Sequence, residues 1–219
     1  MNIQNILFDL DGTLTDPAEG IVKSYQYSLG RLNRDCPPPG ELTTLIGPPI
    51  RPTFAAILQS SDVSLIEQAV ALCRERFSTV GLFENHVYEG VPEMLTSLRA
   101  SGYKLFVATS KPQIFAERVL RHFSLESHFI GVHGNELNGR LDDKAELVGE
   151  LIAERHLKPD ETLMVGDRWH DVVAAKRNSL FSLGVTYGYG AEAELREAGA
   201  DHICHTPEDV ARLMAAESV

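Results

Sequence analysis

The chain has 219 residues, with 20 basic and 31 acidic side chains, and its net charge of −11 argues against nonspecific binding to nucleic acid or to an anionic membrane. Apolar residues make up 43% of the chain, which is ordinary for a globular protein and argues against a disordered one. No apolar run approaches the length of a membrane span, and the three cysteines form no C-x-x-C pair. We therefore expect a cytoplasmic protein without a disulfide framework.

Apolar spacing and turn residues predict the order of elements along the chain. Residues 3–8 form a short apolar run that is typical of a buried strand. Residues 18–32 and 65–77 have helical apolar spacing, and Asp16 is the expected N-cap of the first of these helices. The segment 15–85 is therefore predicted to be all helical, with no strand in it.

After residue 90 the pattern changes to an alternation of strands and helices. The expected strands are 104–108, 129–133, 162–165, 181–185 and 201–203, and the expected helices are 91–100, 112–122, 143–155, 170–178, 191–198 and a last one from Pro207. Such alternation favours a parallel sheet covered by helices on both faces. We therefore expect an α/β fold with a Rossmann-like core, residues 1–14 and 86–219, and an inserted α-helical cap domain, residues 15–85.

Polar side chains follow three of the predicted strands at the point where each strand ends. They are Asp9, Asp11, Thr109, Ser110, Asp167 and Asp171. In an open parallel sheet, ligands bind outside the carboxyl ends of the strands, so these side chains are expected to meet at one edge. Lys144, at the start of a predicted helix, can join them.

Carboxylates at close quarters repel one another and raise each other's pKa, a conflict that a divalent cation removes. Oxygen ligands with few carboxylates suit Mg²⁺, which also binds the oxygens of a substrate phosphate. An aspartate can act as a nucleophile and form an aspartyl-phosphate. Asp11 lies two residues after Asp9. A second carboxylate at that place can protonate the leaving oxygen and then activate water. Thr109 and Ser110 can hold the remaining phosphate oxygens through hydroxyl and backbone N–H groups.

The order of these residues resembles the four motifs of the haloacid dehalogenase superfamily. The matching stretches are Asp9-x-Asp11-Gly12-Thr13, Thr109-Ser110, Lys144 and Gly166-Asp167-x-x-x-Asp171. The resemblance covers most of the chain, including a helical cap between the first two motifs. Within the superfamily, the segments 8–16, 108–112 and 187–190 are most similar to phosphoglycolate phosphatases and 5′-nucleotidase-like phosphatases.

The resemblance implies a role for each matching residue. Asp9 would be the nucleophile and Asp11 the acid and base, while Thr109 and Lys144 would hold the phosphate. Mg²⁺ would be bound by Asp9, by Asp11 through its carbonyl, and by Asp167. Asp171 would orient the ligands without binding the ion directly, or would act through a water molecule. Lys111 is the rival of Lys144 for the phosphate.

The function expected from this resemblance is Mg²⁺-dependent hydrolysis of a small phosphomonoester, such as phosphoglycolate or a nucleoside 5′-monophosphate. A sugar phosphomutase and a non-catalytic phosphometabolite-binding module are the alternatives. A dehalogenase is disfavoured, because an acid/base residue such as Asp11 serves phosphoryl transfer rather than halide displacement. The oligomeric state is left open.

Two further segments have two interpretations each. Arg51, expected in a cap loop, either binds the non-reacting part of the substrate or is a surface arginine. The segment Tyr187-Gly188-Tyr189-Gly190 is either a flexible loop at the rim of the site or a plain turn between a strand and a helix.

Overall fold

A computed structural model describes residues 2–217, and the chain divides into two compact units. The core unit is Met1–Thr15 with Val87–Val219, and the inserted unit is Asp16–His86. The inserted unit begins and ends one residue later in the chain than the expected bounds of 15 and 85. Within residues 2–217, no helix is both long and apolar enough to cross a membrane.

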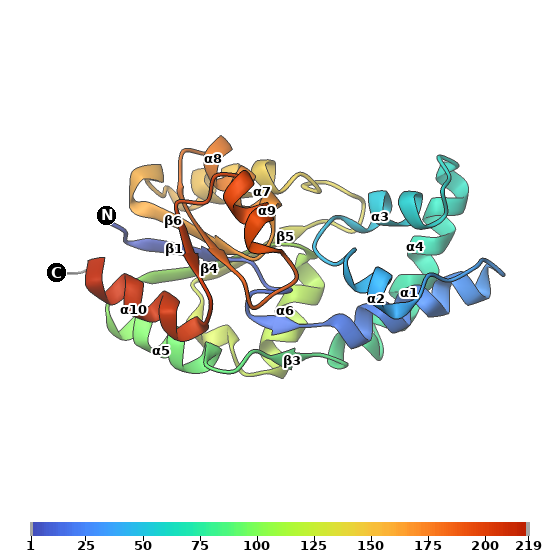
Figure 1. Ribbon diagram of the computed structural model, residues 1–219, viewed down its shortest axis with the longest axis horizontal. Coiled ribbons are helices and arrows are strands. Elements are labelled where there is room, and N and C mark those ends of the chain that lie inside the picture. The colour runs from blue at the N-terminus through green and yellow to red at the C-terminus, as the bar shows by residue number, and fades with distance from the viewer. Residues whose placement is uncertain (1, 218–219) are drawn as a thin grey trace. The chain divides into compact units, whose positions relative to one another are not determined.

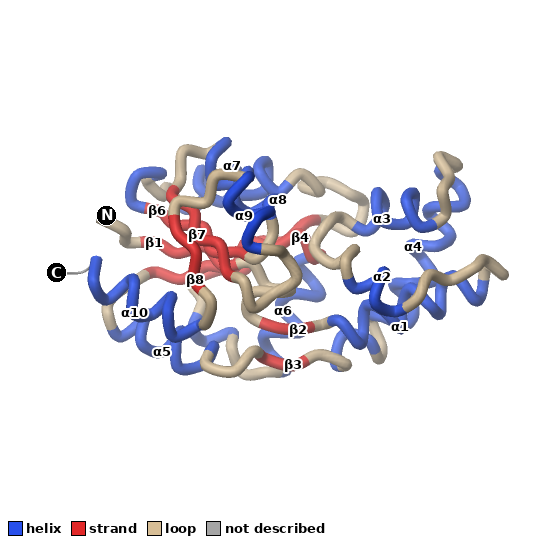
Figure 2. Tube along the Cα trace, viewed as in Figure 1, coloured by secondary structure: helices blue, strands red, loops and turns tan. Residues whose placement is uncertain are grey.

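The core unit contains a sheet of six parallel strands in the order β5-β4-β1-β6-β7-β8. Figure 2 draws the strands in red. The strands are β1 (Asn5–Phe8), β4 (Lys104–Pro112), β5 (Gly131–Asn135), β6 (Thr162–Gly166), β7 (Phe181–Val185) and β8 (His202–Cys204). All four residues of β1 are buried, because this strand lies inside the sheet, with Phe8 opposite Val107 of β4 and Val165 of β6. The chain that leaves β1 therefore emerges between the ends of β4 and β6.

Helices cover both faces of this sheet, as Figure 1 shows. One face carries α7 (Lys144–Arg155) and α8 (Trp169–Arg177), and the other carries α5 (Val91–Ala100), α6 (Gln113–His122) and α10 (Pro207–Glu217). The short elements are α9 (Glu192–Glu197), η2 (Glu126–His128) and η3 (Pro159–Glu161). Apolar side chains of α7 and α8 pack on β1, β4 and β6 in one buried cluster. The expected α/β fold is confirmed.

The strands β4 and β5 differ from the prediction at their carboxyl ends. β4 continues to Pro112 instead of stopping at residue 108, and its pairing with β5 shifts register between Thr109 and Pro112. Gly134 of β5 permits this arrangement, because a Cβ atom there would lie 2.4 Å from the carbonyl oxygen of Lys111. A bulge of this kind disrupts side-chain alternation, so the apolar pattern did not reveal the last residues of either strand.

The inserted unit is built from helices around its own apolar cluster, which includes an edge-to-face contact of Tyr25 and Phe54. Its elements are α1 (Ala18–Arg31), α2 (Pro39–Thr43), α3 (Ile50–Ile57), α4 (Val63–Phe77) and η1 (Gly81–Phe83). The expectation of no strand in 15–85 was wrong, because β2 (Thr15–Asp16) pairs with β3 (His86–Val87). Two-residue strands are too short to show a period, and this pair joins distant parts of the chain.

The start of α1 also differs slightly from the prediction. Pro17, not Asp16, is the residue at the N-cap, but the Asp16 carboxylate still accepts a hydrogen bond of 2.9 Å from the Ala18 N–H. The aspartate therefore satisfies one free N–H of the first turn, which is the physical role expected of it.

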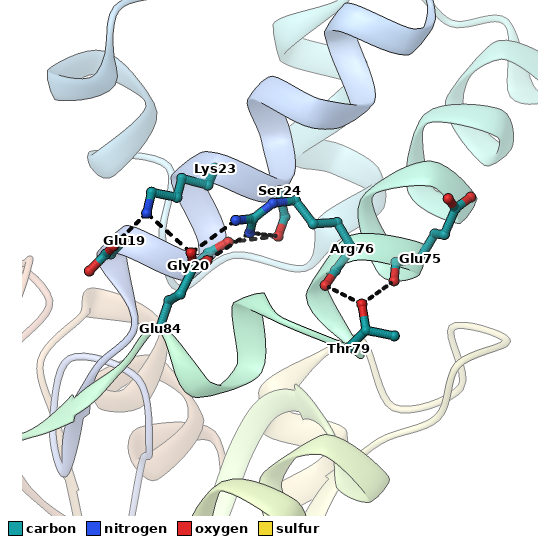
Figure 3. A network of polar contacts seen from close by, with 8 residues as sticks. All are labelled: Glu19, Gly20, Lys23, Ser24, Glu75, Arg76, Thr79 and Glu84. Carbon is teal, nitrogen blue, oxygen red and sulfur yellow. Dashed lines mark hydrogen bonds and ion pairs between the residues drawn. The ribbon is translucent and has the colours of Figure 1, made fainter.

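A polar network connects the first helix of the inserted unit to the last residues of the same unit (Figure 3). The Arg76 guanidinium donates to both carboxylate oxygens of Glu84 at 2.8 and 3.0 Å, and Lys23 of α1 reaches the same carboxylate at 3.1 Å. The Gly20 N–H donates to the Glu84 carbonyl at 3.0 Å. A Cβ atom on Gly20 would lie 1.9 Å from the Gly81 carbonyl oxygen, so only glycine permits this backbone contact.

Candidate active site

Three carboxylates meet at the carboxyl edge of the core sheet. Asp9 follows β1 and Asp167 follows β6, while Asp171 lies in the first turn of α8. All three are buried, and each offers an oxygen that lies within 4.8 Å of the others. The backbone holds two of them in place: the Asp9 N–H donates to the Val165 carbonyl at 2.9 Å, and the Asp171 carboxylate accepts from the Arg168 N–H at 3.0 Å.

Lys144 supplies positive charge to this group from the first position of α7. Its Nζ lies 2.9 Å from Oδ1 of Asp9 and also pairs with Oδ1 of Asp171. Burial lowers the pKa of Lys144, but the charges of Asp171 and Asp9 outweigh it and raise the pKa above its usual value. The ammonium group is therefore charged at neutral pH. The Asp143 carboxylate caps α7 by accepting from the Ala145 N–H at 2.8 Å, which fixes where Lys144 begins the helix.

Lys111 forms a second ion pair at the same edge, with Asp11. Its Nζ lies 2.6 Å from the Asp11 carboxylate, and both side chains are largely buried. Burial raises the pKa of Asp11, and the neighbouring Lys111 charge opposes part of that rise. The sequence predicts Lys111 only as a rival of Lys144, whereas in the structure the two lysines pair with different carboxylates, Lys111 with Asp11 and Lys144 with Asp9 and Asp171. The sequence signal was its place directly after Thr109-Ser110.

The charges of this cluster do not balance. Four carboxylates, those of Asp9, Asp11, Asp167 and Asp171, face two ammonium groups. Burial and the charges of Asp171 and Asp9 raise the pKa of Asp167 well above its usual value, and burial raises the pKa of Asp171 to about 6 against the opposing charge of Lys144. One divalent cation would restore neutrality, and a compact set of carboxylate oxygens has the donor chemistry that Mg²⁺ prefers. The residues present therefore fit a bound Mg²⁺.

Two glycines allow the acidic side chains to lie against the backbone. A Cβ atom on Gly166 would lie 2.1 Å from Cγ of Asp171, and one on Gly12 would lie 2.2 Å from Oδ2 of Asp167. Gly12 also has a φ of +87°, a conformation that other residues rarely adopt. Both glycines belong to the motifs noted in the sequence, but the close approach could not be inferred from their spacing.

The predicted phosphate-binding residues lie at the end of β4. Thr109 is buried, and its Oγ1 accepts a hydrogen bond of 3.2 Å from the Lys111 N–H. Ser110 follows it and is half-buried. Their contact with a phosphate stays a prediction.

Arg51 belongs to the inserted unit. It is the second residue of α3, so its expected place in a loop was wrong: Pro49 is extended and Ile50 already begins the helix. Its guanidinium pairs with the Glu67 carboxylate, with Nε 2.5 Å from Oε1 and Nη2 3.2 Å from Oε2. A contact of Arg51 with substrate stays a prediction.

The chain is similar to proteins of known family and to solved structures. Residues 6–185 match the family model described as haloacid dehalogenase-like hydrolase. A 5′-nucleotidase of Pseudomonas aeruginosa is 46% identical over 91% of this chain and 90% of its own length. The tyrosine-protein kinase PtkA of Mycobacterium tuberculosis is 36% identical over 85% of this chain and 63% of its own. The crystal structure of a predicted phosphatase from Clostridium acetobutylicum superimposes with a TM-score of 0.94 at 38% identity, covering 99% of this chain and 100% of that one.

Proposed function

This chain is a phosphatase that belongs to the haloacid dehalogenase-like hydrolase family, and we propose that it hydrolyses small phosphomonoesters with Mg²⁺ through an aspartyl-phosphate on Asp9. The observation that carries the proposal is the buried cluster at the sheet edge. It combines two carboxylates two residues apart, each paired with its own lysine, with two further carboxylates that leave negative charge in excess. A site that only bound an anion would not gather four carboxylates, three of which are buried.

In this proposal Asp9 accepts the phosphoryl group, and Asp11 transfers the protons in both steps of the reaction. A carboxylate oxygen of Asp9 attacks phosphorus, and the ester P–O bond breaks as Asp11 gives its proton to the leaving oxygen. Asp11, now a carboxylate, takes a proton from a water molecule that attacks the phosphorus. The bond to Asp9 breaks, and inorganic phosphate leaves. Burial raises the pKa of Asp11 above its usual value, which is the direction that the proton donor of the first step needs, and Lys111 opposes part of that rise.

The lysines and the metal ligands have supporting roles. Lys144 orients the Asp9 carboxylate and offers positive charge to the phosphate, and Lys111 holds the Asp11 carboxylate in position. Asp9, the Asp11 carbonyl and Asp167 would hold Mg²⁺. Asp171 would orient these ligands without binding the ion directly, or would reach it through a water molecule. When bound, the cation would neutralise charge that develops on the phosphate oxygens. Thr109 and Ser110 would hold the remaining phosphate oxygens.

The resemblance and the names of the relatives support the proposed substrate class. The 5′-nucleotidase relative favours nucleoside 5′-monophosphates, and phosphoglycolate is the second candidate. In this proposal the inserted unit serves as a cap that excludes water and selects the substrate, with Arg51 as a candidate contact to its non-reacting part.

The test is release of inorganic phosphate from nucleoside 5′-monophosphates, phosphoglycolate, sugar phosphates and an aryl phosphate, each with Mg²⁺ and with EDTA. We expect release only with Mg²⁺, and net release of phosphate separates hydrolysis from a mutase reaction. Absence of Mg²⁺-dependent release from every substrate, together with measurable ligand affinity, would favour a non-catalytic binding module instead.

A further inference from the structure

The loop between β7 and α9 contacts the proposed metal ligand Asp167, although it contributes no carboxylate of its own. This loop contains the segment Tyr187–Gly190, which we call the YGYG loop. Its Tyr189 N–H donates a hydrogen bond of 2.8 Å to Oδ2 of Asp167. The other oxygen, Oδ1, lies 3.5 Å from the Thr13 hydroxyl, which donates to it. The carboxylate is therefore held from two sides, by a loop after β7 and by the loop after β1.

The glycines of the YGYG loop make this contact possible. A Cβ atom on Gly188 would lie 2.1 Å from the Gly12 carbonyl oxygen and 2.5 Å from Cβ and Oδ2 of Asp167. A Cβ atom on Gly190 would lie 1.8 Å from the Asp167 carbonyl oxygen. Real Cβ atoms do not approach other atoms so closely, and the nearest atom at each position is a backbone carbonyl oxygen, which cannot swing away as the end of a side chain can. Both positions therefore require glycine, and the Asp167 side chain is enclosed between Gly12 and Gly188.

Tyr187 attaches the loop to the segment that carries Asp9 and Asp11. Its hydroxyl donates to the Thr13 carbonyl at 3.1 Å, and its ring packs edge-to-face on Tyr88, with centroids 5.2 Å apart. Burial raises the pKa of the Tyr187 hydroxyl, so the hydroxyl remains a donor at neutral pH. The loop after β7 is thus bonded both to the metal ligand after β6 and to the loop after β1.

From these contacts we infer that the YGYG loop is a positioning element that sets the place of the Asp167 carboxylate relative to Asp9 and thereby the affinity of the site for Mg²⁺. The inference rests on the proposed function, because it concerns the same metal site. The segment does connect a strand to a helix, as one of the two sequence-based interpretations expected, and the inference adds a positioning role to that connection. Groups that hold a metal ligand in place commonly change metal affinity about 10- to 100-fold when they are altered.

The test measures Mg²⁺ binding directly, by titration calorimetry on the purified full chain in the absence of substrate. Gly188→Ala keeps every proposed ligand but forces the loop away from Asp167, and we expect the Kd for Mg²⁺ to rise about 10- to 100-fold. Tyr187→Phe is a milder variant that keeps the ring and removes only the bond to Thr13. We expect its Kd to rise about five-fold. Gly30→Ala is the control, because a Cβ atom there meets nothing within 4 Å.

A purely structural role would lower the melting temperature of the metal-free variants without changing the Kd for Mg²⁺, and that result would overturn the inference. If Gly188→Ala fails to fold, Tyr187→Phe decides: an unchanged Kd refutes the positioning role and a raised Kd supports it. A wild-type chain that binds no Mg²⁺ would refute the proposed metal site, and this inference with it. If the wild-type chain binds Mg²⁺ and both variants bind it with the same Kd, the inference is refuted and the proposed metal site is not.

Discussion

Replacing Lys144 by methionine tests whether this lysine compensates the negative charge of the buried carboxylates when no metal is bound. The side chain is 5% exposed and pairs with Asp9 and Asp171, so Lys144→Met removes the positive charge shared by two buried carboxylates while keeping much of the volume. Removing one partner of a buried pair commonly costs about 3–5 kcal/mol of unfolding free energy, because the remaining charges stay buried without compensation. We expect a loss of that size in EDTA.

The assay is urea denaturation, with Lys158→Met as the matched control. Lys158 pairs with Glu161 at 2.8 Å, but its side chain is 69% exposed, so its loss should change the unfolding free energy far less than the loss of Lys144. Mg²⁺ should restore part of the stability lost in Lys144→Met, since the cation replaces the missing positive charge. A loss in EDTA no larger than that of the control would refute the assignment of Lys144 as the ion that compensates the cluster.

The pH dependence of the same variant provides a second check. The pKa of Asp171 is raised to about 6 with Lys144 present, and removal of the ammonium charge, which lowers it, would raise it further. A carboxyl whose folded pKa lies above its unfolded value destabilises the fold increasingly as the pH rises through that pKa. The deficit of Lys144→Met should therefore shrink between about pH 8 and about pH 5. A deficit independent of pH would contradict this account.

Three further predictions concern catalysis. Asp9→Asn should abolish phosphate release and leave the circular dichroism spectrum unchanged, because only the nucleophile is lost; full activity would remove Asp9 from that role. Lys111→Met should move the pH–rate profile to higher pH, because Lys111 lowers the pKa of Asp11 and its loss lets that pKa rise; an unshifted profile would show that Asp11 does not govern it. Asp167→Ala should raise the Mg²⁺ concentration needed for half-maximal phosphate release, and an identical Mg²⁺ titration would exclude Asp167 as a ligand.

Much of the fold could be predicted because its elements have strong local patterns. The helix Val91–Ala100 has Gly90 as its N-cap and Pro92 in its first turn, and a proline at that place is typical of a helix start. The short helices Pro39–Thr43 and Ile50–Ile57 were not located individually, because neither is long enough to show a clear apolar period. The pairing of Thr15–Asp16 with His86–Val87 depends on contact between distant segments, which a local pattern does not report.

The sequence by itself determined which residue types stand at the end of each central strand, and hence the candidate site. Asp9, Asp11 and Asp167 follow apolar runs, and Thr109 lies near the end of another, and each run is a local pattern. Only the tertiary structure decided which charges are partners. Lys111 pairs with Asp11 across 100 positions of chain, and the Tyr189 N–H donates to Asp167 from the loop that follows the neighbouring strand β7. Such contacts depend on strand order and on backbone approach at glycines, which are set by packing of the whole core rather than by neighbouring residues.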